Sequence, residues 1–360
     1  HLRRPHIDQT GYQGLGRATV SALRPAAPSL SILIPTLNEA AALPALLADI
    51  AGQRRIRCEV IVADGGSSDA TLQIARRHRA RLLRTPRGRG AQLNAAAAVA
   101  QAPWLLCLHA DSRLTAPDQL ASALTLLRAE AEKGKAVAGH WPLRFVRADA
   151  GHDRLFRHLE AKTASNRPGT VNGDQGLLLH RDFFLALGGF NDTLPFFEDQ
   201  RIAAQIFSQG RFVLLPGLLH TSARRFEVEG HNTRMALMAL MVGAEAAGLD
   251  DWLGSLPALY RQQQEATQLS LVPFLHSLSE HIQSLPPARR RTVWRAAGQL
   301  VASNGWQLAQ ALDVAVDSAH GLWLGWFDRH LARVFATPAT SLLAARLTEG
   351  VIRTGAKLKT

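Results

Sequence analysis

Residues 30 to 39 read Leu30-Ser-Ile-Leu-Ile-Pro-Thr-Leu-Asn-Glu39, and residues 59 to 66 read Glu59-Val-Ile-Val-Ala-Asp-Gly-Gly66. Each stretch is a short apolar run followed by turn-forming residues, which predicts two buried strands. The alternation continues with a helix at 43–50, a helix at 68–78 with Ser67 or Ser68 as its N-cap, a strand at 81–84, a helix at 91–101 and a strand at 104–108. This order predicts an α/β fold with a doubly wound, mostly parallel sheet.

The chain changes character after this first part. Further strands are expected at 137–146, 176–179, 210–215 and 218–222, with a helix at 197–208. After Gly230 the pattern is mainly helical. We therefore expect three regions: a mobile basic lead-in at 1–29, an α/β domain at 30–262, and a helical C-terminal region at 263–360 with no assigned role.

Composition limits the classes of function. The 360 residues are 47% hydrophobic and 19% charged, which excludes a fully disordered chain. Forty-one Lys and Arg against 29 Asp and Glu give a net charge of +12, which favours anionic partners. The basic run from Arg76 to Arg89 contains no stacking aromatic residue, so we expect no nucleic-acid partner.

Cysteine usage and hydropathy bear on the compartment. Two cysteines, Cys58 and Cys107, cannot form a disulfide framework, and a reducing compartment fits them. No run of about 18 uncharged apolar residues predicts a transmembrane helix, and no signal peptide is recognised. The expectation is a cytoplasmic protein, with peripheral association at the inner face of a membrane left open.

Acidic residues follow the predicted strands at the edge where parallel sheets bind ligands. Asp64 precedes Gly65-Gly66, and Asp111 follows the strand at 104–108. Glu198 and Asp199 follow two phenylalanines, where an apolar wall would raise the pKa of one acid and suit it to act as a base. Taken singly, each is also explained as a turn, a cap or a solvated helix N-terminus.

The motifs taken together and in order resemble the family-two glycosyltransferases. The segments that carry the resemblance are 30–39 and 60–71 for the nucleotide-binding start, Pro86–Asn94 for the basic glycine segment, His109-Ala-Asp-Ser112 for the Asp-x-Asp metal motif, Gly173–Gly176 and Gly188–Phe190 for the acceptor side, and Phe197–Asp199 for the Glu-Asp motif. Thr221–Phe226 is similar to the subset called radical-SAM/selenodomain-associated transferases.

The resemblance implies a GT-A-like fold at 30–262 and transfer from a nucleotide-diphosphate sugar to the hydroxyl of an unknown acceptor, with inversion. A UDP-sugar is favoured and a GDP-sugar is possible. The implied roles are nucleotide binding by Pro35, Thr36, Glu39, Asp64, Gly65 and Arg89; Mn²⁺ or Mg²⁺ binding by Asp111 and His109; base catalysis by Asp199, with Glu198 beside it; and sugar contacts by Asp174, Gln175, Arg224 and Arg225.

One departure keeps alternatives open. His109 stands where the family has the first acid of its metal motif, and histidine suits manganese better than magnesium. A nucleotide-sugar binding protein without turnover and a sugar nucleotidyltransferase therefore remain alternatives. His220 and His231 are further candidate ligands for the metal, although a lone histidine is more often structural.

Two late features allow a structural or a membrane interpretation. Met235, Met238 and Met241 recur every three residues, which indicates core packing or docking to a membrane. The late tryptophans, together with the basic run Arg289–Arg295, form either the core of a helical domain or an interfacial surface. These tryptophans are Trp294, Trp306, Trp323 and Trp326.

Overall fold

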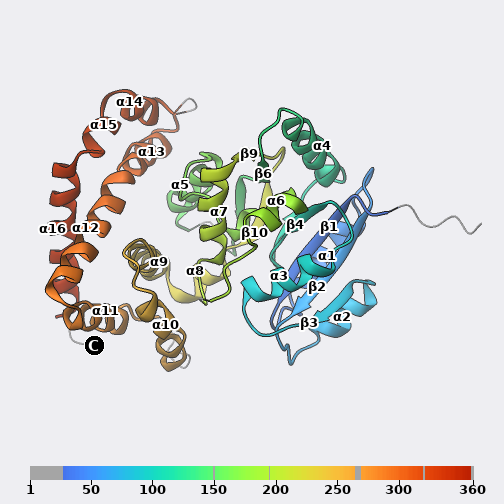
Figure 1. Cartoon of the computed structure of the whole chain (residues 1–360), viewed down its shortest axis with the longest axis horizontal. Coiled ribbons are helices and arrows are strands. Elements are labelled where there is room, and N and C mark those ends of the chain that lie inside the picture. The colour runs from blue at the N-terminus through green and yellow to red at the C-terminus, as the bar shows by residue number, and fades with distance from the viewer. Residues whose placement is uncertain (1–26, 149–150, 194, 264–268, 319–320, 358–360) are drawn as a thin grey trace, which may run out of the picture.

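Among the residues that the structure describes, seven strands form one central sheet (Figure 1). Their order is β3-β2-β1-β4-β8-β6-β9, and β8 alone runs antiparallel to both of its neighbours. The strand bounds are β1 Leu30–Thr36, β2 Cys58–Asp64, β3 Arg81–Arg84, β4 Trp104–Cys107, β6 Val137–His140, β8 Leu177–His180 and β9 Arg211–Leu214. The predicted doubly wound, mostly parallel sheet is confirmed.

The computed structural model describes residues 27–148, 151–193, 195–263, 269–318 and 321–357. The predicted lead-in at 1–29 lies outside these residues up to position 26.

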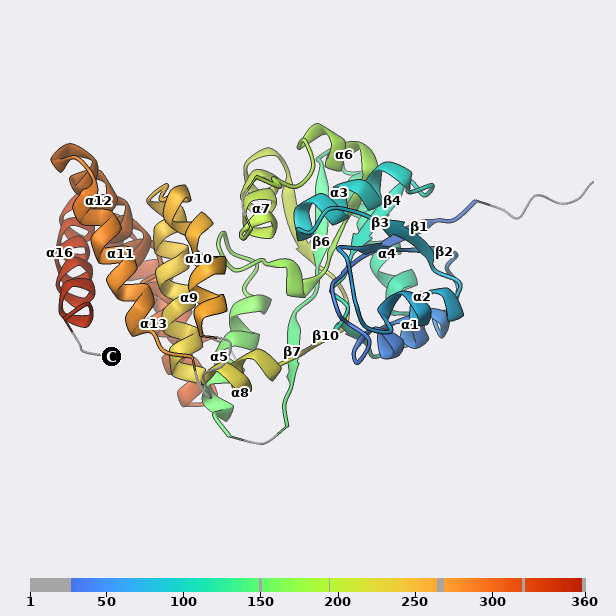
Figure 2. The same cartoon turned by 90° about the horizontal axis from the view of Figure 1, so that it is seen from below.

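Helices cover both faces of the central sheet (Figure 2). Leu30, Ile32 and Ile34 of β1 pack on one face, whereas Leu33 packs on the other, because side chains alternate along a strand. The first face carries α1 Leu43–Ala51, α2 Thr71–Arg77 and α4 Gln119–Ala131. The second face carries α3 Arg89–Val99, α6 Arg181–Ala186 and α7 Glu198–Gln209.

A second, three-stranded sheet of the described residues lies beside the first, in the order β5-β10-β7. The expected strand at 137–146 was wrong as a single element: it divides at Pro142 into β6 of the central sheet and β7 of this one. Proline has no N–H to donate to a ladder, which explains the break. The further bounds are β5 Arg113–Leu114, β7 Leu143–Val146, β10 Leu219–Ser222, α5 Asp153–Ala164, the 3₁₀ turn η1 Gly173–Gln175 and α8 Arg224–Glu229.

Helices make up the regular structure of the described residues after Gly230, where the sequence predicted a mainly helical region. They are α9 His231–Ala246, α10 Asp250–Gln262, α11 Val272–Ser284, α12 Pro287–Ser303, α13 Trp306–Ala315, α14 Leu322–His330, α15 Ala332–Phe335 and α16 Pro338–Gly355. One buried cluster joins α9 and α10 to α11, α12 and α16. Among the described residues, no helix has both the length and the hydropathy needed to cross a membrane.

The methionine repeat on α9 is part of this packing. Met241 is 8% exposed in the core that α9 shares with the later helices. Met235 and Met238 pack against Phe156 and Phe226. The core interpretation of the repeat is therefore confirmed for Met241, and all three side chains contact other hydrophobic residues.

Candidate functional site

The carboxyl ends of β1 and β2 are held together by one buried side chain. The Nε2 atom of Gln92 on α3 donates to the carbonyl oxygens of Thr36 at 2.8 Å and Ala63 at 2.7 Å. Gly65 donates its backbone N–H to Thr36 at 2.9 Å. Gln92 lies within the 86–94 segment, but no local pattern predicted that this residue joins the two strand ends.

The Asp64 carboxylate organises the loop that follows β2. Its Oδ2 accepts from the backbone of Gly66 at 3.0 Å and Ser67 at 2.9 Å, and its Oδ1 accepts from Thr36 Oγ1 at 3.2 Å. Burial raises the pKa of Asp64, but the hydrogen bonds from Ser67, Gly66 and Thr36 outweigh burial and lower it. Asp64 is therefore an ionised anchor of the loop, with 1% of its surface exposed.

The two serines after Asp64 do not cap α2, contrary to the prediction. That helix begins at Thr71 after Ala70, with no side-chain cap. Ser67 Oγ instead accepts from the backbone of Asn38 at 2.8 Å, and the backbone of Ser68 donates to Asn38 Oδ1 at 2.8 Å. These bonds join the β1–α1 and β2–α2 loops, which places the backbone of Glu39 at the sheet edge.

The charges of Asp111, Arg224 and Arg225 act on Glu39, which follows β1. Burial and the negative charge of Asp111 raise the pKa of Glu39, while the charges of Arg224 and Arg225 lower it. Within the part of the chain that the structure describes, none of the four side chains has a hydrogen bond or an ion pair. Two carboxylates and two guanidinium groups are thus available to a ligand.

His109 pairs with Asp174 beside this group. Its Nδ1 lies 2.7 Å from Asp174 Oδ1. Burial lowers the pKa of His109, but the hydrogen bond and charge of Asp174 outweigh it and raise the pKa above 6.5. Burial opposes ionisation of Asp174 as well, yet His109 lowers the pKa of that carboxyl from 3.8 to about 2. The contact uses Nδ1, and a histidine that ligates a metal commonly bonds a carboxylate through its other ring nitrogen.

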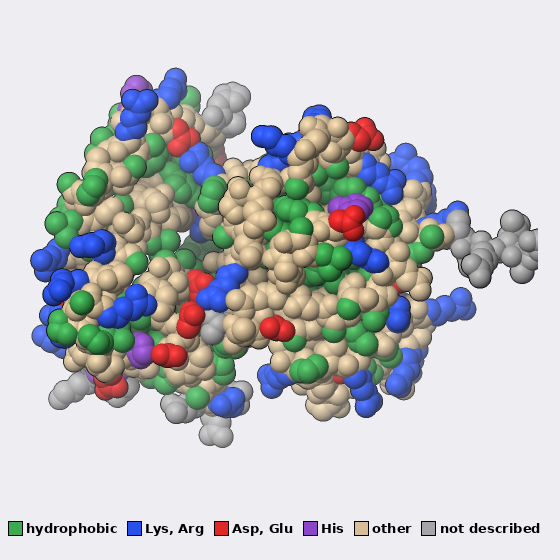
Figure 3. All heavy atoms as spheres, viewed as in Figure 1, with side chains coloured by type: hydrophobic (Ala, Val, Ile, Leu, Met, Phe, Trp, Pro, Cys, Tyr) green, Lys and Arg blue, Asp and Glu red, His purple; other side chains and the backbone are tan. Residues whose placement is uncertain are grey.

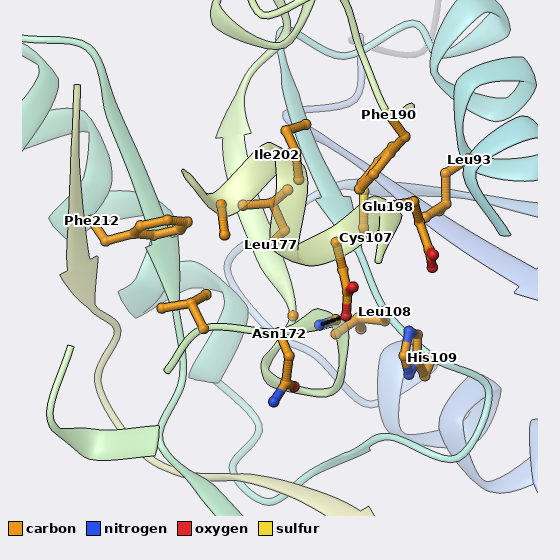
Figure 4. Close-up of a pocket in the computed structure, with 15 residues that line it drawn as sticks. Leu93, Cys107, Leu108, His109, Asn172, Leu177, Phe190, Glu198, Ile202 and Phe212 are labelled. Carbon is orange, nitrogen blue, oxygen red and sulfur yellow. Dashed lines mark hydrogen bonds between the residues drawn. The ribbon is translucent and has the colours of Figure 1, made fainter. Parts of the chain in front are cut away.

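Asp199 faces the same place from the N-terminus of α7. Its Oδ2 accepts from the Gly173 backbone at 2.7 Å, a bond drawn in Figure 4, and its Oδ1 accepts from Gln200 at 2.8 Å. A Cβ on Gly173 would lie 2.8 Å from His109 Nε2 and 3.2 Å from Asp199 Oδ2. Glycine therefore lets His109 and Asp199 approach each other across η1.

Glu198, the neighbour of Asp199, is buried and paired. Its side chain is 4% exposed, and its Oε1 lies 2.7 Å from Nε of Arg89. Burial raises the pKa of Glu198, and Arg89 opposes that rise. The raised pKa that the sequence suggested for one of the two acids therefore falls on Glu198, the acid that is already paired.

The remaining predicted residues differ in access. The side chain of Asp174 is 47% exposed, whereas Gln175 is fully buried and donates to the Thr170 carbonyl at 2.6 Å. Pro35 is buried within β1. Behind Asp199 and His109 lies a mainly apolar hollow, lined among others by Leu93, Cys107, Val171, Phe190 and Ile202 (Figure 4).

Few side chains at this site could ligate a divalent cation. No group of three or more His, Cys, Asp or Glu side chains among the described residues is placed to hold a metal. Magnesium is often held by one or two carboxylates together with substrate phosphates. The unpaired Asp111 carboxylate fits such a site, and His109, with Asp174 on its Nδ1, stays a candidate ligand through Nε2. His231 stacks on His152 at 3.9 Å between ring centres, which explains it as a packing residue.

Comparison with known proteins agrees with this arrangement of strand-end loops. Residues 31–173 match the model of Glycosyl transferase family 2. That match covers β1, β2, β3, β4 and β6 of the central sheet and ends at Gly173, before Asp199, Arg224 and Arg225. The matched segment thus includes the Asp64 loop and Asp111.

Two mycobacterial relatives are similar over the same part of the chain. A PGL/p-HBAD biosynthesis glycosyltransferase of Mycobacterium bovis is 43% identical over 103 residues, which are 27% of this chain and 40% of that protein. An uncharacterised glycosyltransferase of M. bovis is 36% identical over 128 residues, which are 32% of this chain and 54% of that protein. The chain thus matches about half or less of the length of these relatives.

Solved structures show a distant likeness. A mannosyltransferase of Pyrobaculum calidifontis, in complex with GDP-Man and Mn²⁺, aligns with a TM-score of 0.46 at 20% identity, covering 89% of this chain and 86% of that one. TarS 1-349 of S. aureus, in complex with UDP-GlcNAc, aligns with a TM-score of 0.47 at 17% identity, covering 84% of this chain and 92% of that one.

Proposed function

We propose that this protein is an inverting glycosyltransferase that moves a sugar from a nucleotide-diphosphate sugar to an acceptor hydroxyl. The observation that carries the proposal is the meeting of four unpaired charged side chains, Glu39, Asp111, Arg224 and Arg225, in front of the β1 and β2 loops. The family-two match at 31–173 and the names of the relatives support the same class of reaction.

The donor nucleotide is proposed to bind at the loops after β1 and β2. Pro35, Thr36, Asp64 and Gly65 form the floor of this part, and Glu39 offers a free carboxylate to a ribose or base. A UDP-sugar is the first choice and a GDP-sugar the second. Both nucleotides belong in the first binding experiment.

The diphosphate is proposed to lie between Asp111 and the two arginines. Guanidinium forks suit phosphate oxygens, and Arg224 and Arg225 are exposed on α8. Arg89, whose Nε is paired with Glu198, remains a third candidate. Asp111 would hold Mn²⁺ or Mg²⁺, and a bound cation would neutralise charge on the leaving diphosphate.

Asp199 is the proposed general base. Each of its oxygens accepts one backbone hydrogen bond, at 2.7 and 2.8 Å, which fixes the carboxylate and leaves lone pairs free for an acceptor hydroxyl. In a single displacement this carboxylate would take the hydroxyl proton as the oxygen attacks the anomeric carbon. Asp174, half exposed beside it, is the proposed sugar contact, whereas Gln175 is too deeply buried for direct contact without rearrangement.

The test combines nucleotide binding with product analysis. UDP and GDP are titrated calorimetrically with and without Mn²⁺, and a panel of UDP- and GDP-sugars is then incubated with candidate acceptors. Release of the nucleoside diphosphate supports transfer. Release of pyrophosphate would indicate a nucleotidyltransferase, and binding without either product would indicate a passive binder.

The variant Asp199→Asn distinguishes a role in base catalysis from a role in nucleotide binding. We expect turnover to fall by about 10²–10⁴-fold, because a positioned base contributes that much, while nucleotide affinity is retained. Asp111→Asn is the matched variant on the donor side and should remove the dependence of binding on Mn²⁺. Unchanged turnover in Asp199→Asn would refute the base assignment.

Two finer expectations stay predictions. The first is that this protein belongs with the radical-SAM/selenodomain-associated subset, which the segment Thr221–Phe226 resembles. The cytoplasmic location is likewise an expectation from the sequence. Localisation of the tagged full-length protein would test it.

A further inference from the structure

Exposed apolar side chains are concentrated at the C-terminal end of the chain. Among the described residues, twelve of the fifteen large hydrophobic side chains that are strongly exposed lie between positions 301 and 351. Scattered single apolar residues are normal on a protein surface, but a concentration of this kind marks an interaction site. The α/β part contributes only Val146, Leu185 and Val228.

Helix α16 carries the most regular part of this surface. Leu343, Leu347 and Val351 are 62%, 63% and 70% exposed, and their spacing of four residues places them in one stripe along the helix. Leu342, 62% exposed, and Arg346 lie four residues apart in a neighbouring row. The opposite side of α16 is buried: Ala344, Ala345 and Ile352 are at most 8% exposed.

The same mixture of apolar and basic side chains occurs on the neighbouring helices. Trp323 and Trp326 on α14 are 44% and 47% exposed, and Arg329 follows on the same helix. The late tryptophans therefore divide between the two interpretations that the sequence left open. Trp306 is 6% exposed and belongs to a small core, whereas Trp323 and Trp326 face outward.

The positive charge of the C-terminal helices indicates an anionic partner for this surface. From Pro287 to the end of the sequence, ten Lys and Arg stand against four Asp and Glu. Figure 3 shows hydrophobic and basic side chains interspersed over the C-terminal helices. A face that combines exposed leucine and tryptophan with arginine is complementary to the headgroups and acyl chains of an anionic lipid surface.

We propose that the outer face of α16, with Leu342, Leu343, Leu347 and Val351 flanking Arg346, docks this protein on an anionic membrane. The helix would lie in the plane of the interface and insert its leucine stripe, while Arg346 contacts lipid phosphates. Both views of the fold place α16 at the end of the molecule farthest from β2 and β3 (Figures 1 and 2). The docked surface is thus separate from the proposed donor site.

The experiment measures co-sedimentation of the full chain with lipid vesicles. Vesicles of phosphatidylcholine are compared with vesicles that also contain phosphatidylglycerol, at low and high salt. We expect binding to the anionic vesicles alone, weakened by salt because the charge attraction is screened. Equal binding to both kinds of vesicle, or binding to neither, would overturn the proposal.

Two variants assign the binding to α16. The triple variant Leu343→Gln, Leu347→Gln, Val351→Gln should lose at least about tenfold in partitioning, since each removed side chain leaves the inserted face. Arg346→Glu should lose about 25-fold, because each unit of charge near the surface is worth about fivefold. Leu185→Gln, at a 63% exposed site on α6, is the matched control and should bind like the unmodified protein.

A second copy of the chain is the competing occupant. Light scattering of the unmodified protein and of the triple variant distinguishes the two. A dimer that becomes monomeric in the triple variant would assign the face to self-association and refute membrane docking. Unchanged melting temperature and unchanged UDP or GDP binding in each variant show that the fold is intact, so that reduced sedimentation reports the surface.

Discussion

Replacing Arg89 with methionine tests the buried contact between α3 and α7. The Nε of Arg89 lies 2.7 Å from Oε1 of Glu198, whose side chain is 4% exposed. Removing one partner of a buried ion pair costs about 3–5 kcal/mol, because the other charge is left without compensation. Since 37% of the Arg89 side chain is exposed, water weakens this particular pair. We expect Arg89→Met to lower the free energy of unfolding by about 2–3 kcal/mol at pH 8.

The loss should depend on pH in a defined direction. Burial raises the pKa of Glu198 above 4.5 even with Arg89 present, and removal of the Arg89 charge should raise that pKa further. The native state then binds more protons than the unfolded state between the two pKa values. The contribution of protonated Glu198 to the free energy of unfolding is fully present below pH 4.5. It is lost as pH rises through the folded pKa of Glu198, by up to about 1.4 kcal/mol per pH unit.

The assay is urea-induced unfolding at pH 5 and pH 8 for a double-mutant cycle. The cycle comprises the unmodified protein, Arg89→Met, Glu198→Gln and the double variant. We expect the deficit of Arg89→Met to be much smaller at pH 5, and the double variant to recover most of it at pH 8, because no buried charge remains. An Arg89→Met deficit that is equal at both pH values, or additive effects in the double variant, would refute the reasoning.

Three further substitutions probe the site. Gly173→Ala should lower turnover at least about tenfold with nucleotide affinity retained, because its Cβ would displace His109 and Asp199; unaltered kinetics would contradict the close approach. Asp174→Asn should lower the pKa of His109, as followed by NMR titration. In the unmodified protein the His109–Asp174 pair contributes most to stability between pH 3.8 and 6.5, and this contribution is lost as pH rises through the raised pKa of His109. The melting temperature of Asp174→Asn should therefore lack that decline with pH. Gln92→Leu should cost about 2–3 kcal/mol in urea unfolding and weaken UDP or GDP binding, since two strand-end carbonyls lose their donor; an unchanged midpoint would contradict this role.

The sheet was predictable because its signals are local. The apolar runs of β1, β2 and β4 are bounded by turn residues, and the helices between them require a parallel arrangement. The expected strand at 137–146 was wrong because the sequence does not show how a chain uses a proline between two apolar runs. Pro142 ends the ladder of the central sheet and lets β7 pair with β10 instead.

The side chains at the strand ends could be predicted by position but not by partner. The strand-end positions predicted that Asp64 and Asp111 would lie at one edge of the sheet, whereas Asp199 was assigned as the base through the family resemblance. These positions did not predict that Ser67 would bond to Asn38 across two loops, or that Arg89 would bind Glu198, because both contacts join segments distant in sequence. The burial of the late tryptophans was equally unpredictable, because the local sequence does not show whether a tryptophan side chain faces a core or solvent.

The position of the proposed base depends on helices that lie outside the family-two match. Phe197 has a left-handed backbone, with φ of 68°, immediately before the two acids, a conformation that a bulky residue adopts only when its surroundings impose it. Its side chain is 6% exposed in the core built by α9, α10 and the later helices. Arg201, one turn further along α7, pairs with Glu245 at 2.6 Å and with Asp250 at 3.1 Å. The acids at the N-terminus of α7 are thus fixed on one side by η1 of the α/β part and on the other by α9 and α10. It follows that the helical region is a structural component of the candidate site, and that residues 31–173 alone contain neither Asp199 nor the helices that hold it in place.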